Sequence, residues 1–197
     1  MKTIEVIFID INKISSEALF NSSFLSDDNV FNLSKYKVEE VKKEKACSLI
    51  VKNKYIGEYQ LNKYGKPICK SCYFNISHSK GALVFVKDDK EIGIDIEKIR
   101  KVDDKLVDYI SSKEERKYIN NEINFYEIWT SKESLVKAIG TGIGKVKEIP
   151  GLPINGIKKY INNEYFIKNI KYNDFIISIT RKEIEPFDIK IKEIEEL

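Results

Sequence analysis

The stretch Gly93-Ile94-Asp95-Ile96-Glu97 constrains the fold most, because apolar and acidic side chains alternate along it. Alternation with a period of two is typical of a β-strand that buries one face. We therefore expect Asp95 and Glu97 on the same face, about 6–7 Å apart along the backbone. Neighbouring carboxylates repel each other, and a hard cation such as Mg²⁺ relieves that repulsion because it prefers oxygen ligands. The simpler alternative is a strand edge that ends in solvated acids.

Length and charge exclude several classes of protein. A chain of 197 residues can bury a real core, as one domain or as two small ones. The net charge of +3 arises from 34 basic and 31 acidic residues, so anion binding must come from local placement of lysines. This near balance, without a basic stripe, argues against a nucleic-acid-binding module. No stretch approaches the roughly 20 apolar residues of a membrane span, and no signal peptide is recognisable, so we expect a cytoplasmic protein.

The cysteines point to the same compartment. Three of them in a chain without an export signal predict free thiols: Cys47, Cys69 and Cys72. Cys69-Lys70-Ser71-Cys72 is an isolated CxxC motif, and the single histidine, His78, follows it. Because a structural zinc site needs four ligands, these residues supply at most half of one.

The first hundred residues predict a strand, a helix and three further strands. The strand covers residues 1–10 and the helix covers 38–56, ending near Gly57, with turns and one short helix between residues 14 and 33. Gly65 and Pro67 predict a loop at residues 64–67. Strands over 73–77 and 82–87 follow, joined by a polar turn at 78–81, before the strand at 93–97.

The remaining residues predict helices and then strands. A charged connector at 100–104 marks the boundary between two halves, residues 1–100 and 101–197. Residues 107–120 predict a helix that is interrupted near Ser111, because residues 111–115 resemble a capping box. The clearest helix covers 125–139 and is stopped by Gly140-Thr141-Gly142. Strands are expected over 165–172, 175–181 and 187–194.

A faint internal repeat relates the two halves. Residues 82–87 precede 93–96 at the same offset by which residues 175–180 precede 186–189. If the repeat is real, each half is a small sheet with a helix. Glu97 then corresponds to Lys190, so only the first half keeps two acids, Asp95 and Glu97. Similarity this short can also arise by chance.

Glu133 and Lys137 lie four residues apart on the clearest helix and are therefore neighbours on one face. An exposed pair of this kind stabilises a helix by a few tenths of a kcal/mol. Alternatively, Glu133 is a third metal-binding carboxylate and Lys137 binds phosphate, which suits its compact ammonium charge. Ser77 and His78, at the polar end of a strand, could also hold a phosphate or could be ordinary surface residues.

Four motifs occur in one order within residues 65–140: Gly65-Lys66-Pro67, Phe74-Asn75-Ile76-Ser77-His78-Ser79, Gly93-Ile94-Asp95-Ile96-Glu97, and Trp129-x-x-Lys132-Glu133-x-x-x-Lys137-x-x-Gly140. The set resembles the 4′-phosphopantetheinyl transferases of the surfactin-synthetase type. The resemblance implies a Mg²⁺-dependent enzyme, with Mn²⁺ as a substitute, that moves phosphopantetheine from coenzyme A to a serine of an apo acyl or peptidyl carrier protein. 3′,5′-Adenosine bisphosphate would be released. The implied fold is an α/β (α+β) monomer of two similar halves, related by a pseudo-two-fold, with the active site in the cleft between them.

The resemblance also assigns binding roles to individual residues. Three carboxylates would hold Mg²⁺: Asp95, Glu97 and Glu133. Ser77 and Lys137 would contact the pyrophosphate of coenzyme A, and His78 its 3′-phosphate. The adenine side would be lined by Tyr64, Gly65, Lys66 and Pro67.

The assignment of the catalytic base stays open. Glu133 is the first candidate to accept the serine proton and Glu115 the second. Lys132 would lie near the reacting phosphate or the incoming carrier protein. The family usually carries an arginine on a first-half helix for the 3′-phosphate, whereas this chain offers lysines there: Lys42, Lys43 and Lys45. Two alternatives remain: another Mg²⁺-dependent transferase of a phosphate-bearing substrate, and an inactive, transferase-like module that binds carrier proteins.

Overall fold

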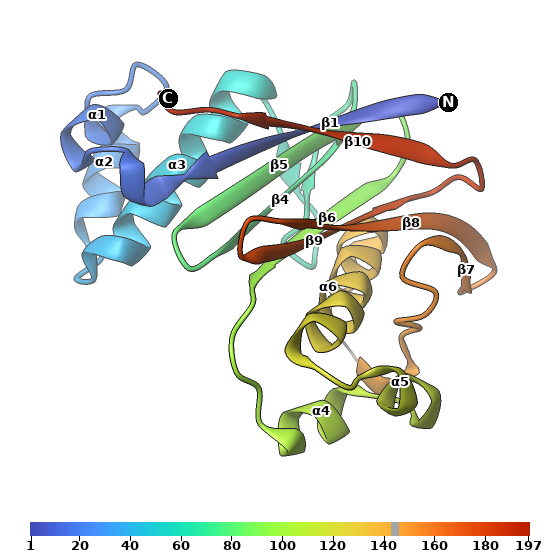
Figure 1. The fold of residues 1–197 in the computed structure, drawn as a ribbon. Helices are drawn as coiled ribbons and strands as arrows, with labels where there is room; N and C mark the ends of the chain where they lie inside the picture. The colour runs from blue at the N-terminus through green and yellow to red at the C-terminus, as the bar shows by residue number, and fades with distance from the viewer. Residues whose placement is uncertain (143–145) are drawn as a thin grey trace.

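The computed structural model describes residues 1–142 and 146–197. It is an α+β fold with two four-stranded sheets, one in the order β10-β1-β5-β4 and the other in the order β6-β9-β8-β7 (Figure 1). Helices cover the outer side of each sheet. This arrangement confirms the predicted fold class of small sheets packed with helices.

The first sheet joins strands from both ends of the sequence. Its strands are β1 (Lys2–Asp10), β4 (Tyr73–Ser79), β5 (Ala82–Asp88) and β10 (Phe187–Glu193). β1 runs parallel to β10 and antiparallel to β5. On its outer side lie η1 (Ile11–Lys13), α1 (Ser16–Phe20), α2 (Asp27–Ser34) and α3 (Glu39–Tyr55). The long helix α3, predicted over 38–56, packs its buried residues against the sheet: Ala46, Cys47, Ile50 and Val51.

The second sheet is antiparallel throughout. Its strands are β6 (Ile92–Lys98), β7 (Gly156–Tyr160), β8 (Asn163–Tyr172) and β9 (Phe175–Arg181). It is covered by α6 (Glu122–Ile139), which ends at Gly140 in the left-handed conformation that glycine adopts readily. α4 (Asp104–Ile110), α5 (Lys113–Tyr118) and η2 (Val146–Glu148) complete this side. The predicted break in the earlier helix is confirmed, because Ser112 and Glu115 form a capping box at the start of α5.

The main core lies between the two sheets. Ile94 and Ile96 of β6 are fully buried there and meet apolar side chains from β1, β5 and β9. Burial of an isoleucine of this kind stabilises the folded state by about 1.5–3 kcal/mol. The apolar half of the 93–97 alternation is therefore buried as predicted.

The other face of β6 is covered closely by α6. A Cβ atom on Gly93 would come within 2.0 Å of the Ser134 carbonyl oxygen and 2.4 Å of the Ala138 nitrogen, so a side chain there is excluded. Small hydroxyl residues allow the same close approach to β9, where Ser134 and Thr180 share a hydrogen bond of 2.8 Å. The helix thereby brings its own polar residues next to the acidic residues of β6.

The sheets exchange one strand each. β6 follows β5 of the first sheet but pairs with β9, whereas β10 follows β9 and pairs with β1 (Figure 1). This reciprocal crossing agrees with the predicted relation of 82–87 and 93–96 to the two C-terminal segments. The division at residue 100 stays a prediction, but the strand with the two acids belongs to the sheet of the second half.

Several predicted boundaries were wrong. His78 and Ser79 lie in β4, not in the following turn, which narrows to Lys80 and Gly81, both with positive φ. Two short strands, β2 (Gln60–Leu61) and β3 (Pro67–Ile68), flank the predicted loop. β7 was missed, because its sequence lacks an alternating pattern.

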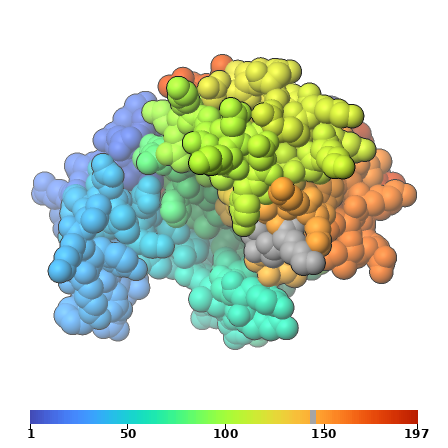
Figure 2. Space-filling view, turned by 90° about the horizontal axis from the view of Figure 1, so that it is seen from below, coloured from blue at the N-terminus to red at the C-terminus, as the bar shows by residue number. Residues whose placement is uncertain are grey.

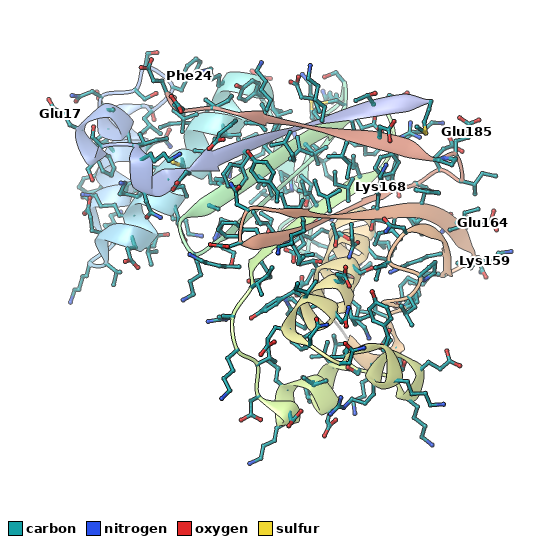
Figure 3. The ribbon with its side chains drawn as sticks, in the orientation of Figure 1. Glu17, Phe24, Lys159, Glu164, Lys168 and Glu185 are labelled. Carbon is teal, nitrogen blue, oxygen red and sulfur yellow. The ribbon has the colours of Figure 1, made fainter. Side chains whose placement is uncertain are left out.

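The surface carries dispersed ion pairs. Lys159 and Glu164 pair at 3.0 Å across the β7–β8 hairpin and lie together at one edge of the molecule (Figure 3). An exposed pair of this kind contributes little to stability. Among the described residues, no helix combines the length and the apolar character needed to cross a membrane.

Candidate active site

The site begins where β4, the edge of the first sheet, meets β6, the edge of the second. Side chains two residues apart on β4 bond to β6: the Asn75 side-chain oxygen accepts from the Ile94 N–H at 3.0 Å, and the Ser77 hydroxyl donates to Asp95 at 2.8 Å. The Ser79 hydroxyl donates to Glu97 at 2.7 Å. An edge strand needs partners for its free backbone and polar groups, and β4 supplies them from its side chains.

Lys137 of α6 contacts both strands where β4 and β6 meet. Its ammonium lies 2.6 Å from Asp95 Oδ1 and 2.8 Å from the Ser77 hydroxyl. Asp95 is almost fully buried, whereas Lys137 is 29% exposed at its side chain. The second oxygen of Asp95, Oδ2, is buried and has no hydrogen-bond partner within the described part of the chain.

The predicted carboxylates form one electrostatic cluster. Burial raises the pKa of Glu133 to about 7, and the negative charges of Asp95 and Glu97 add to this effect, while Lys137 opposes it. Burial also raises the pKa of Glu97, with a further contribution from Asp95. The charge of Asp95 therefore makes ionisation of Glu97 and Glu133 harder. The solvated-edge interpretation of the 93–97 strand is wrong, because Asp95 is buried.

A pocket of about 480 Å³ opens beside the cluster, between the two halves of the chain. Glu133, Lys137 and the last turns of α6 form one wall. The opposite wall contains all four residues of the predicted coenzyme loop: Tyr64, Gly65, Lys66 and Pro67. Figure 2 shows this region in turquoise, projecting from the molecule as a separate lobe. The structure thus brings the loop, Glu133 and Lys137 to one pocket, whereas Asp95, Glu97, Ser77 and His78 are not among its lining residues.

The loop is attached to the end of α6 by side chains. The Lys66 ammonium donates to the Ala138 carbonyl, and the Asn62 amide donates to the Gly140 carbonyl at 3.3 Å. The Asn62 side-chain oxygen also accepts the Lys66 N–H at 2.9 Å, which holds the turn. Sequence reasoning missed Asn62 and Asn75. The only local signal was an asparagine three residues before Gly65, a residue type common in turns.

His78 lies at the margin of the site. Its Nδ1 is 3.5 Å from a carboxylate oxygen of Glu44 on α3, and its side chain is 41% exposed. Burial lowers the pKa of His78, and the charge of Lys45 lowers it further. Three first-half lysines were candidates for the 3′-phosphate: Lys42, Lys43 and Lys45. The charge of Lys45 acts on His78, whereas the Lys43 ammonium donates to the Ile14 carbonyl. The predicted contact of His78 with a 3′-phosphate stays a prediction.

Glu115 and Lys132 pair with each other inside the second half, away from the pocket wall. Their charged groups are 2.8 Å apart, with side-chain exposures of 1% for Lys132 and 5% for Glu115. Lys132 also donates to the carbonyls of Ile110 and Val146, at 2.9 and 3.0 Å. Both oxygens of Glu115 are occupied, since they accept from the backbone N–H groups of Ser112 and Gly151. These contacts favour a structural role over the predicted catalytic one.

A divalent cation fits the chemistry of the acidic cluster. Three carboxylates surround one ammonium group, and the buried Asp95 Oδ2 has no hydrogen-bond partner. A bound cation would reduce the repulsion among the carboxylates and would give this oxygen a partner. As the side chains stand, no three His, Cys, Asp or Glu side chains in residues 1–142 and 146–197 are arranged to hold a metal ion. Binding would therefore require the carboxylates to converge.

Comparison with known proteins identifies the relatives of this fold. Residues 91–180 match the family model of the 4′-phosphopantetheinyl transferase superfamily. The 4′-phosphopantetheinyl transferase gsp of Aneurinibacillus migulanus is 37% identical over 92 residues, which cover 43% of this chain and 39% of the relative. Over less than half of its length, the chain is therefore similar to the 4′-phosphopantetheinyl transferase superfamily.

Two further transferases resemble a longer part of the chain. The 4′-phosphopantetheinyl transferases ffp of Bacillus subtilis and Sfp of Bacillus subtilis (strain 168) are 31% and 29% identical over 126 residues, covering 55% of this chain and 56% of each relative. The matched segments therefore cover 39% to 56% of the length of these relatives. These results confirm the resemblance to the surfactin-synthetase type of phosphopantetheinyl transferase.

The segment that matches the superfamily model contains the acidic cluster and α6 with Lys137. The coenzyme loop at 64–67, Ser77 and His78 precede that segment. The comparisons with known proteins therefore do not test the predicted roles of these residues, which stay predictions from the sequence motifs.

Proposed function

We propose that this protein transfers the 4′-phosphopantetheine group from coenzyme A to a serine hydroxyl of an apo acyl or peptidyl carrier protein, with release of 3′,5′-adenosine bisphosphate. One observation carries the proposal: Glu133 and Lys137, whose ammonium pairs with the buried Asp95, border a pocket whose other wall is the 64–67 loop. A pocket of this size, with a few convergent polar groups, is typical of a small-molecule site.

The pyrophosphate of coenzyme A would lie against Lys137 and Ser77. Both groups donate to Asp95 Oδ1, at 2.6 Å from Lys137 and 2.8 Å from Ser77, so donors from α6 and β4 already converge on one negative oxygen. Negative charge on the phosphate oxygens rises as the serine attacks, and donors held in place stabilise it without reorganisation. Lys137 is half-buried, which strengthens its electrostatic effect compared with a lysine in water.

Glu133 is the first candidate for the base in this proposal. Its pKa of about 7 applies to the metal-free chain, so with Mg²⁺ bound the proton of the serine would pass to this carboxylate directly or through a water beside the metal. Glu115 is disfavoured because its oxygens already accept two backbone N–H groups and pair with Lys132.

The three carboxylates would hold Mg²⁺, or Mn²⁺ in its place: Asp95, Glu97 and Glu133. A bound divalent ion of this kind offsets charge on phosphate oxygens. Lys137, which now neutralises part of the charge on Asp95, would then be free to serve the phosphate.

The adenine side of coenzyme A would lie against the 64–67 loop, and His78, with Lys45 near it, would face the 3′-phosphate. Support comes from the pocket lining and from the electrostatic coupling of these two residues. We further propose a cytoplasmic monomer, because the cysteines are free and the cleft is complete within one chain.

The test is the intact mass of an apo carrier protein after incubation with this chain, coenzyme A and Mg²⁺. We expect a gain of one phosphopantetheine, which EDTA prevents and added Mg²⁺ restores. Glu133→Gln should lose activity, whereas Glu122→Gln, an exposed glutamate at the start of the same helix, should keep it. Unchanged mass in several apo carriers would overturn the proposal, and carrier binding without transfer would favour an inactive binding module.

A further inference from the structure

Cys69 and Cys72 lie in the short loop that connects β3 to β4, apart from the acidic cluster. Both side chains line one small cavity of about 170 Å³. Lys66 and Pro67, which line the larger pocket, also border this cavity. The two thiols therefore lie behind the wall of the proposed coenzyme site.

The sulfur of Cys69 has a hydroxyl beside it: the Ser71 Oγ lies 3.2 Å away. The neighbouring backbone N–H groups of Ser71 and Cys72 favour the thiolate together with that hydroxyl. Successive N–H groups that converge on one point stabilise an anion. The pKa of Cys69 is lowered to about 7, first by the Ser71 hydroxyl. Near neutral pH a large fraction of Cys69 is thus a thiolate, the nucleophilic form of cysteine.

Cys72 differs from Cys69 in the direction of its pKa shift, as expected for a resolving thiol, the one that attacks a mixed disulfide formed on its partner. Burial first, and then its interaction with Cys69, raise the pKa of Cys72, so this thiol stays protonated near neutral pH. The third cysteine provides an internal contrast. Cys47 is fully buried on α3, and burial raises its pKa to about 12, which makes it unreactive in the folded chain.

We propose that Cys69 and Cys72 form a dithiol site that reacts with low-molecular-weight disulfides of the glutathione class and closes into a reversible intrachain disulfide. This assignment does not depend on the transferase activity. It uses the CxxC motif that the proposed function leaves without a role.

The exchange proceeds in two displacements. The Cys69 thiolate attacks one sulfur of the small disulfide, whose S–S bond breaks, and one small thiol leaves while a mixed disulfide forms on Cys69. Cys72 then loses its proton to solvent and attacks the Cys69 sulfur, and the second small thiol leaves. The two cysteines together give up two electrons and two protons, and the small disulfide is reduced to two thiols.

The first experiment follows the intact mass of the folded chain during incubation with oxidised glutathione at pH 7. We expect the mass to fall by two hydrogen atoms and peptide mapping to join Cys69 to Cys72. Cys72→Ser should instead accumulate the glutathione adduct on Cys69, because no resolving thiol remains. Cys47→Ser should behave like the original chain.

The second experiment measures the rate of Cys69 alkylation by iodoacetamide against pH. The rate should rise with a midpoint near pH 7, and Ser71→Ala should move the midpoint upward, toward the ordinary thiol value of 9.0. Three results would overturn the proposal: no intrachain disulfide, adduct accumulation in Cys69→Ser rather than Cys72→Ser, or alkylation of Cys69 at pH 7 that is no faster in the folded chain than in urea.

Discussion

Replacing Lys137 with methionine tests the central contact of the site, because it removes the charge and keeps a long apolar side chain. Asp95 Oδ1 would lose a partner at 2.6 Å, in a position where the carboxylate is nearly inaccessible to water. A hydrogen bond to a charged group contributes about 1.5–3 kcal/mol, and the partial exposure of Lys137 reduces this by solvent screening. We expect a loss of about 2 kcal/mol in the free energy of unfolding.

Urea unfolding followed by circular dichroism measures this loss, which corresponds to a fall in Tm of about 4–8 °C for a chain of this size. The control is Lys117→Met, an exposed lysine on α5, which should change stability by less than about 0.5 kcal/mol. The double variant Asp95→Asn/Lys137→Met should be more stable than the two single losses predict, because no buried charge is left unpaired.

The coupling between the two positions is the decisive quantity. If the single-variant losses add within about 0.5 kcal/mol, Lys137 and Asp95 do not interact in solution, and the geometry of the site is wrong. Transfer activity separates structure from chemistry: the double variant should recover stability yet remain inactive. Recovery of both would mean that the pair only supports the fold.

Three further predictions follow from single contacts. In the folded chain the pKa of Glu133 is raised to about 7, so the free energy of unfolding falls as pH rises from about 4.5 through 7. Glu133→Gln should therefore stabilise the metal-free chain at pH 8 by on the order of 1–2 kcal/mol and leave its stability unchanged near pH 4. Urea unfolding in EDTA at the two pH values measures both effects. Gly93→Ala should lower Tm sharply and displace α6, at a cost of about 3 kcal/mol, because the added methyl meets helix backbone; an unchanged Tm would contradict the packing. His78→Ala should weaken binding of coenzyme A more than that of dephospho-coenzyme A in calorimetry, and equal losses with both ligands would place His78 away from the 3′-phosphate.

Local patterns predicted the elements of this fold well. The alternation at 93–97, the apolar stripe of α6 and the capping box at Ser112 each depend on residues close in sequence, and each is present in the structure. His78 was misplaced because Lys80 and Gly81 alone make the turn. The β7 strand was missed because its sequence, Gly-Ile-Lys-Lys-Tyr, does not alternate between apolar and polar residues.

Long-range partners could not be predicted from spacing. The sequence places Glu133 and Lys137 on one helix face, but Lys137 pairs with Asp95 on another element, which only the crossing of α6 over β6 decides. In the same way, Lys132 looks like part of the active-site motif, yet it turns inward to Glu115. The motif at residues 129–140 therefore identified the correct helix. It did not show which polar residues of that helix face the cleft.

The exchanged strands limit how the cleft can open. The β1–β10 ladder runs from Lys2↔Phe187 to Phe8↔Glu193, and the β6–β9 ladder from Ile92↔Arg181 to Lys98↔Phe175. A hinge motion that swung one half away from the other would have to tear one of these ladders, so domain closure of the usual hinged kind is blocked. The 62–66 loop is held to the end of α6 by side-chain bonds to Ala138 and Gly140, so its displacement would break neither of these two ladders.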